Sequence, residues 1–232
     1  MKYDLVENQS PWLEDIYLEY FGYKTDGFFV ELGVGHTYYQ PWDAHGRGGR
    51  LCGSNTGPLA DLGWNGILVE PHPFYYEESV KRHKDNDVQI ANYAAGAVDQ
   101  TVLLGLGDTL RADVQQNFSR LGWLTEVQRN ADYPDNAFEV EEKNILSILE
   151  EYNCPKKFDL LSVDVEGYER IIFGALDLNI YRPKVMVVEL RTTDDRFDEI
   201  FKKESEEVEE LIINQGYKKI YSDILNGVFV EE

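Results

Sequence analysis

The chain has 232 residues, and 22 Lys and Arg against 43 Asp and Glu give it a formal net charge of −21. A chain of this length can bury one hydrophobic core without disulfides or a structural metal. The charge argues against a broad nucleic-acid groove, which needs clustered Lys and Arg. No apolar run approaches the roughly 18 residues of a membrane span, and the two cysteines, Cys52 and Cys154, form no zinc pattern. We expect a soluble, cytoplasmic protein.

Apolar periodicity divides the first part of the chain into alternating helices and strands. Ser10 before Pro11 is typical of a helix start, and Gly22 is typical of a helix end. The predicted elements are a helix over about 10–22, a strand over 28–32, a short helix ending at Gly63 or Gly66, a strand over 66–70, a helix over 75–84 and a strand over 88–92. Strands that alternate with helices indicate a parallel α/β sheet.

The same alternation continues in the second part of the chain. The predicted elements are strands over 101–104 and 138–141, a helix over 145–152, a strand over 158–163, a helix over 168–176, a strand over 185–190, a helix over about 197–214 and a hairpin of strands over 217–221 and 227–230. The strand over 185–190 is the most continuous apolar run, so we expect it inside the sheet. The polar stretch 107–136 lacks clear periodicity and is interpreted as an excursion from the core.

The first two predicted strands each end at a glutamate, Glu31 and Glu70, and Gly33 and Gly35 follow the first. In open α/β sheets ligands bind beyond the carboxyl ends of the strands, where glycines let a ligand lie against the backbone. A carboxylate after the second strand suits a ribose, because it accepts hydrogen bonds from both vicinal hydroxyls. A third glycine and a phosphate loop are missing. The pattern favours a nucleoside cofactor without a pyrophosphate, with a purely structural turn as the alternative.

Two further segments are expected near the same sheet edge. Ser54-Asn55-Thr56 is either an ordinary helix cap or a contact for the carboxylate of an amino-acid moiety, because a helix N-terminus attracts anions. Asp164 and Glu166 follow the strand over 158–163. Acids there can bind an ammonium group, orient a substrate hydroxyl or ligate a hard cation. The alternative is a helix cap at Asp164 and a favourable first-turn acid at Glu166.

These residues resemble a known family. The segments GFFVELGVG, SNTGPLADLGWNGILVEPHP, FDLLSVDVEGYERIIFGAL and VMVVEL are similar to the FkbM-type methyltransferases, which are class I S-adenosylmethionine-dependent enzymes. The resemblance implies an α/β, Rossmann-like fold with a seven-stranded, mostly parallel sheet, a C-terminal antiparallel hairpin and helices on both faces. It also implies one class I domain over 1–232, with an N-terminal helix at about 10–22 and insertions at about 36–53 and 107–136.

The resemblance further implies S-adenosylmethionine as the cofactor and assigns the site residues. The expected cofactor-binding residues are Glu31, Gly33 and Gly35 on the methionine side, Ser54, Asn55 and Thr56 near the carboxylate, Glu70 and Pro71 at the ribose, Asn92 near the adenine, and Asp164 beside the transferred methyl group. The expected catalytic residues are Asp164, Glu166 and His36, with His72 as another proton acceptor. Asp164 or Glu166 would orient the acceptor hydroxyl directly or through Mg²⁺.

The expected activity is O-methylation of a hydroxyl on a sugar, a glycan or a small natural product. The chain departs from the family pattern at the insertion 36–53, and Glu189-Leu190-Arg191 stands where an acid and a histidine are expected. One alternative is a non-catalytic Rossmann-like module that binds a nucleoside or a protein. Another is a nucleoside-diphosphate-using dehydrogenase or epimerase, which the missing third glycine and the lack of a YxxxK pair disfavour. A homo-oligomer stays open.

Overall fold

The computed structural model describes residues 13–35, 37, 53–106, 119–121, 137–190 and 199–232. Residues Ser10 and Pro11, which were predicted to begin the first helix, lie outside this part of the chain. None of the helices in the described ranges combines the length and the apolar composition that crossing a lipid bilayer requires.

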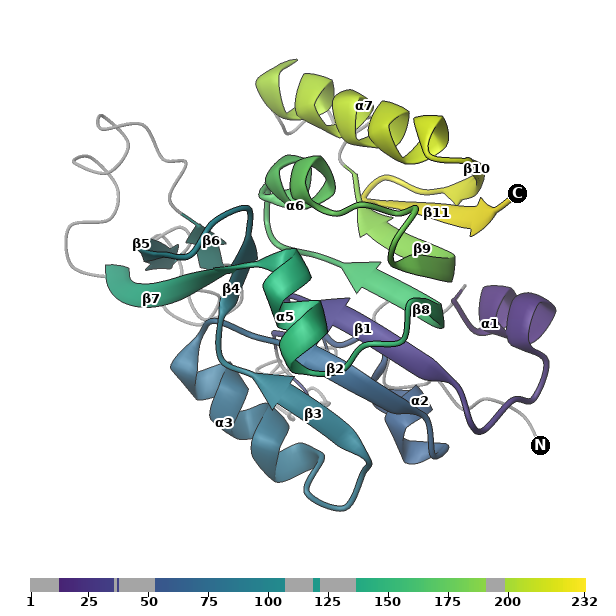
Figure 1. Cartoon of the computed structure of the whole chain (residues 1–232), viewed down its shortest axis with the longest axis horizontal. Coiled ribbons are helices and arrows are strands. Elements are labelled where there is room, and N and C mark those ends of the chain that lie inside the picture. Colours follow the sequence, from purple (N-terminus) through teal and green to yellow (C-terminus); the bar gives the residue numbers. More distant parts are fainter. Residues whose placement is uncertain (1–12, 36, 38–52, 107–118, 122–136, 191–198) are drawn as a thin grey trace, which may run out of the picture.

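Seven strands form the main sheet, in the order β10-β11-β9-β8-β1-β2-β3 (Figure 1). Their bounds are β1 Phe28–Leu32, β2 Asn65–Val69, β3 Val88–Ala91, β8 Lys157–Val163, β9 Arg182–Glu189, β10 Tyr217–Ser222 and β11 Asn226–Glu231. The strands from β9 to β3 pair in parallel, whereas β11 pairs antiparallel with both β9 and β10. The predicted fold class is therefore confirmed, and β9 lies inside the sheet as expected.

Helices cover both faces of the main sheet and explain why its strands are apolar runs. Successive side chains of a strand point to opposite faces: Val30 and Leu32 of β1 belong to one buried cluster, and Phe29 belongs to the other. The first cluster is covered by α5 Ile145–Glu151, α6 Glu169–Ala175 and α7 Glu199–Asn214, and the second by α1 Leu13–Phe21 and α2 Gly57–Asp61. A sheet buried on both faces needs apolar residues at consecutive positions.

Helix α3, Pro73–Arg82, lies beside α2. The guanidinium of Arg82 bonds the carboxylate of Asp61, and the side-chain amide of Asn86 donates to the carbonyl of Ala60 at 3.0 Å. These contacts hold α3 on the same side of the sheet as α2, next to the ends of β2 and β3. The chain segments that follow β1, β2, β3 and β8 all emerge at one sheet edge, because parallel strands have their carboxyl ends together.

A second, four-stranded sheet lies beyond that edge, on the left in Figure 1. Its strands are β4 Ala94–Gly96, β5 Gln100–Leu106, β6 Ser119–Leu121 and β7 Ala137–Asn144, in the order β4-β7-β5-β6. The predicted strands over 101–104 and 138–141 are confirmed as parts of β5 and β7, and the structure assigns them to this separate sheet. The structure describes only β6 within the predicted insertion 107–136.

Candidate active site

The turn after β1 packs tightly against the loop after β8. Gly33 and Gly35 have φ angles of +79° and +59°, which glycine adopts without the steric penalty of a Cβ atom. A Cβ atom on Gly33 would lie 1.7 Å from the carbonyl oxygen of Asp164, whereas one on Gly35 would meet no atom of the described residues within 4 Å. Gly33 is therefore required for the contact between the two strand ends.

The carboxylate of Glu70, directly after β2, binds this glycine turn. Its Oε2 accepts hydrogen bonds from the amides of Val34 at 3.0 Å and Gly35 at 2.9 Å. Its Oε1 accepts one from the amide of His72 at 2.8 Å. Glu70 is only 3% exposed. The carboxylate thus joins the ends of β1 and β2.

Asn92, directly after β3, lies against the same segment. Its side-chain amide donates to the carbonyl of Glu70 at 2.8 Å and to that of Pro71 at 3.3 Å. The residues predicted for the ribose and the adenine are therefore neighbours at the ends of β2 and β3. His72 caps α3, because its Nδ1 accepts a hydrogen bond from the amide of Phe74 at 3.1 Å. That nitrogen is engaged and cannot at the same time accept a proton from a substrate.

Glu31, on β1, is bonded to the segment that precedes α2. Its Oε2 accepts hydrogen bonds from the hydroxyls of Ser54 at 2.7 Å and Thr56 at 2.6 Å, and its Oε1 accepts one from the amide of Asn55 at 2.6 Å. The Asn55 side chain donates to the hydroxyl of Ser162 on β8 at 3.1 Å. Glu31 is 1% exposed. The acid and the Ser54-Asn55-Thr56 segment thus form one buried polar cluster.

Thr56, the N-cap of α2, makes no side-chain capping bond, and the Ser54 hydroxyl instead accepts from the amide of Gly57 at 3.0 Å. In this structure the carboxylate that the segment binds is that of Glu31. The predicted contacts of Glu31 with the methionine side, and of Ser54, Asn55 and Thr56 with the cofactor carboxylate, stay predictions. The sequence pattern identifies the donors and an acid but not which of them meet.

Burial also changes the ionisation of Glu31. Removal of the carboxyl from water raises its pKa to about 7, although the hydrogen bonds from Ser54, Thr56 and Asn55 act in the opposite direction. Near neutral pH the group is therefore divided between its neutral and its ionised form. Hydroxyl groups suit both forms, because each can donate or accept a hydrogen bond.

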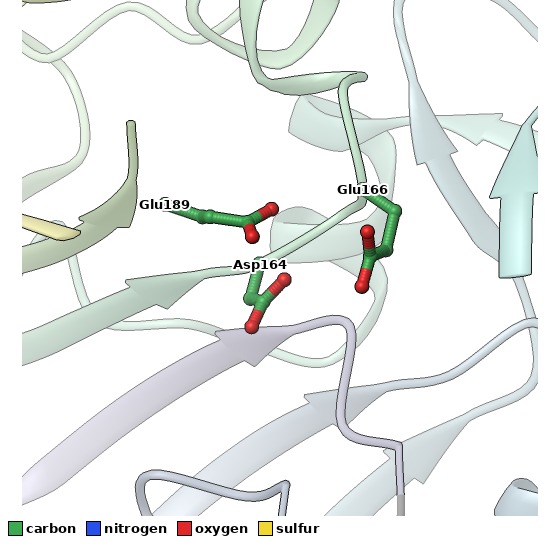
Figure 2. A group of neighbouring side chains, drawn as sticks. All are labelled: Asp164, Glu166 and Glu189. Atoms are coloured by element: carbon green, nitrogen blue, oxygen red, sulfur yellow. The ribbon is translucent and has the colours of Figure 1, made fainter. Parts of the chain in front are cut away.

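Three carboxylates converge near the ends of β8 and β9 (Figure 2). Asp164 follows β8, Glu166 lies in the next turn, and Glu189 is the last residue of β9. One oxygen from each carboxylate lies within 4.8 Å of the others. Ionised groups this close repel one another, so an ammonium group or a hard cation would be stabilised among them. The structure brings the two predicted acids together and adds Glu189, whose sequence signal was its position at a strand end.

The acid loop, residues 164–168, has an unusual backbone that a neighbouring side chain holds. Glu166 and Gly167 have φ angles of 56° and 97°. The Oε1 of Glu169 accepts hydrogen bonds from the amides of Val165 at 3.0 Å and Gly167 at 3.3 Å. Sequence analysis did not single out Glu169, although it stands three residues after Glu166 in the DVEGYE segment. Tyr168 is the N-cap of helix α6, so Asp164 does not cap this helix.

The remaining candidate, His36, lies outside the described residues, as does most of the predicted insertion 36–53. Thr37 is described, and its amide donates to the Oε2 of Glu78 at 3.1 Å. This bond places the chain after the glycine turn beside α3.

A family profile and a solved structure match this chain. The family profile described as "Methyltransferase FkbM domain" matches residues 52–219. No curated protein matches significantly. A solved structure titled "Methanococcus jannaschii fibrillarin pre-rRNA processing protein" is similar over 90% of this chain and 68% of its own, with 15% sequence identity and a TM-score of 0.42.

Proposed function

Because this chain belongs to the FkbM methyltransferase family and is therefore an S-adenosylmethionine-dependent methyltransferase, we propose that it methylates a hydroxyl group of a sugar, a glycan or a small natural product. The observation that supports this best is the direct packing of the glycine turn on the acid loop, where Gly33 leaves room for the Asp164 carbonyl. A cofactor lying on the glycine turn would present its methyl group next to two carboxylates that can bind a hydroxyl.

The residues at the ends of β1, β2 and β3 fit S-adenosylmethionine. Gly35 would take the methionine side, Glu70 and Pro71 would take the ribose, and Asn92 would take the adenine. Glu70 is the chemically suitable acceptor for vicinal hydroxyls. Three backbone amides already donate to its oxygens, so we infer that bonds from the ribose hydroxyls add to these bonds or replace some of them.

Asp164 and Glu166 are proposed to act on the acceptor. The cofactor supplies a methyl group on a sulfonium that is already activated, so the protein mainly has to align the hydroxyl for in-line attack. A carboxylate of Asp164 or Glu166 would accept a hydrogen bond from the hydroxyl and then take its proton as the new oxygen–carbon bond forms. His36 is the alternative proton acceptor that the sequence offers.

The same carboxylates could instead orient the hydroxyl through a bound Mg²⁺ ion. Three carboxylates provide the oxygen ligands that this cation takes in proteins. Direct carboxylate action predicts full turnover in EDTA, whereas action through the cation predicts loss of turnover and recovery with added Mg²⁺.

The ribose assignment is tested by calorimetric titration with S-adenosylhomocysteine. Glu70→Ala should weaken binding at least about tenfold, because a charge-assisted pair of hydrogen bonds is lost. Asp164→Asn should bind the same ligand normally and fail to turn over, because the amide cannot accept the proton. Glu77→Gln, an exposed carboxylate on α3, is the matched control and should behave like the wild type.

Normal affinity in Glu70→Ala would refute the ribose assignment, and normal turnover in Asp164→Asn would leave Glu166 or His36 as the acceptor of the proton. Labelled S-adenosylmethionine with a panel of sugars, glycolipids and hydroxylated small molecules tests the acceptor class. Methylation of an amine or of nucleic acid in place of a hydroxyl would contradict it. We further propose that residues 1–232 form one class I domain and that it acts in the cytoplasm.

A further inference from the structure

A buried carboxylate of the four-stranded sheet is bonded to the end of the acid loop. Glu142 on β7 is 3% exposed. Its Oε1 accepts a hydrogen bond from the amide of Ala97 at 3.2 Å, and its Oε2 accepts from the side-chain amide of Gln100 at 2.7 Å and from the hydroxyl of Tyr168 at 3.3 Å. A Cβ atom on Gly96 would lie 1.8 Å from that Oε1. The carboxylate therefore occupies the space that a side chain at Gly96 on β4 would fill.

Tyr168 connects this carboxylate to α6. Its ring packs on the small buried cluster of the four-stranded sheet, and its carbonyl accepts hydrogen bonds from the amides of Ile171 and Ile172 at 3.1 and 3.2 Å. Burial, with the nearby charge of Glu142, raises the pKa of Tyr168 to about 12. The phenol is therefore protonated at neutral pH and donates to Glu142. The tyrosine thus fixes the start of α6 to the four-stranded sheet.

The acid loop is held at three places along its length. At its start the amide of Asp164 donates to the carbonyl of Leu32 at 2.9 Å. In its middle the carboxylate of Glu169 accepts from two loop amides, and at its end Tyr168 bonds Glu142. Between these anchors Glu166 has a left-handed backbone, which a residue with a Cβ atom adopts only where its surroundings enforce it. Loss of the end anchor should loosen the turn that contains Glu166.

We propose that Glu142 is a positioning residue that acts through Tyr168 to hold Asp164 and Glu166 in place for the acceptor. This role rests on the proposed function and extends it, because it gives the four-stranded sheet a part in aligning the acid loop. Glu142 itself lies in that sheet and contacts the acid loop only through the tyrosine hydroxyl among the bonds described above. Its removal should therefore affect turnover and leave cofactor affinity unchanged.

Amide hydrogen exchange of the full chain tests the proposal without an acceptor. Tyr168→Phe removes only the hydroxyl. Glu142→Gln leaves one acceptor oxygen for Ala97, Gln100 and Tyr168, which in the wild type donate to two oxygens. Both variants should exchange the amides of Val165 and Gly167 at least about tenfold faster than the wild type, with β1 and β9 unchanged. Amide exchange in the double variant should be no faster than in the faster single variant, because both changes act on the same bond between Tyr168 and Glu142. Glu141→Gln, an exposed carboxylate of the same strand, is the control and should have no effect.

The second measurement is turnover with an acceptor identified in the panel. Tyr168→Phe and Glu142→Gln should lower kcat about tenfold, while the Kd for S-adenosylhomocysteine stays within about twofold. Unchanged exchange in Tyr168→Phe overturns the proposal, as does faster loop exchange with an unaltered kcat. A wild-type protein that methylates no hydroxyl would refute the proposed function instead, and the exchange rates would still decide whether Glu142 holds the loop.

Discussion

Gly33 shows how a motif residue can be required by the protein's own backbone. Its Cβ position is filled by the carbonyl oxygen of Asp164, and its φ angle is left-handed. The glycine therefore lets the glycine turn and the acid loop come into contact, which no side chain in its place would allow. A Cβ atom on Gly35, two residues later, would meet no such neighbour among the residues that the structure describes.

Gly33→Ala should destabilise the protein by at least about 2 kcal/mol, because strain of the left-handed backbone adds to a clash with a main-chain atom. Urea unfolding measures the change. The control is Gly174→Ala in α6, where a Cβ atom would meet nothing within 4 Å; it should stabilise by up to about 1 kcal/mol. Equal stability of Gly33→Ala and the wild type would contradict the packing described here.

Glu31 should make the stability of the protein depend on pH. Its pKa is raised from 4.5 to about 7 by burial, so the folded state holds the proton more tightly than the unfolded state. The contribution of Glu31 to the free energy of unfolding is complete below about pH 4.5 and is lost as the pH rises through about 7. The total loss should be about 3 kcal/mol. Unfolding free energies measured between pH 5 and pH 8 follow this change.

Glu31→Gln is the matched control for that measurement, since it keeps the shape and cannot ionise. As the pH rises, the free energy of unfolding of the wild type should fall relative to that of the variant. His83 acts with the opposite sign: burial lowers its pKa, so its contribution is lost as the pH falls below about 6.5. Because His83 is present in both proteins, its effect cancels in the difference. A difference that is constant with pH would show that Glu31 does not titrate in this range.

At the scale of elements, the two sheets differ in the apolar surface that holds them. The main sheet is covered by two large buried clusters, whereas the side chains described for the four-stranded sheet form a small cluster of Ala94, Leu104 and Val140, with Val102 and Tyr168 packed on it. Local stability follows buried apolar contact. The four-stranded sheet should therefore open more readily than the main sheet.

Native-state hydrogen exchange should show this difference between elements. We expect the amides of β5 and β7 to exchange about a hundredfold faster than those of β1 and β8, which are buried on both faces. Addition of S-adenosylhomocysteine should slow the main-sheet amides further, because the ligand stabilises the folded state to which it binds. Equal protection in both sheets would mean that the chain opens as one cooperative unit.

The elements were predictable where their pattern is local. Strand β1 was expected over the residues that the structure assigns to it, and β8, β9, α5, α6 and α7 differ from expectation only at their ends. Strands β4 and β6 were not predicted, because three residues are too few for a pattern. The division into two sheets was not predicted either, since pairing joins β4 to β7 across almost fifty residues, and periodicity within one segment says nothing about its partner.

At the scale of the whole molecule, the net charge of −21 is divided between a few buried acids and many exposed ones. Glu31, Glu70 and Glu142 are buried and bonded by named donors. The exposed acids include Glu206 and Glu210 on α7. Like charges on a surface repel one another and oppose compaction, so the folded state should be sensitive to ionic strength.

Raising NaCl from about 0.05 M to about 0.5 M should raise Tm by roughly 2–4 °C, because the Debye length falls to a few ångströms and screens the repulsion. Thermal unfolding followed by circular dichroism measures the shift. The double variant Glu206→Gln, Glu210→Gln removes two exposed charges and should show a higher Tm at low salt with a smaller response to salt. A Tm that does not change with salt in either protein would contradict a destabilising surface charge.

The sequence by itself determined the fold class, the order of most elements and the family, because periodicity and contiguous motif blocks are properties of neighbouring residues. It also identified the sheet edge at which the acids and glycines gather. Only the tertiary structure decided which partners meet: Glu31 with Ser54-Asn55-Thr56, Glu70 with the glycine turn, Asp164 with Glu189, and Glu142 with Tyr168. Each of these contacts joins different segments of the chain, and their distances follow from how strands and helices pack, which local patterns do not specify.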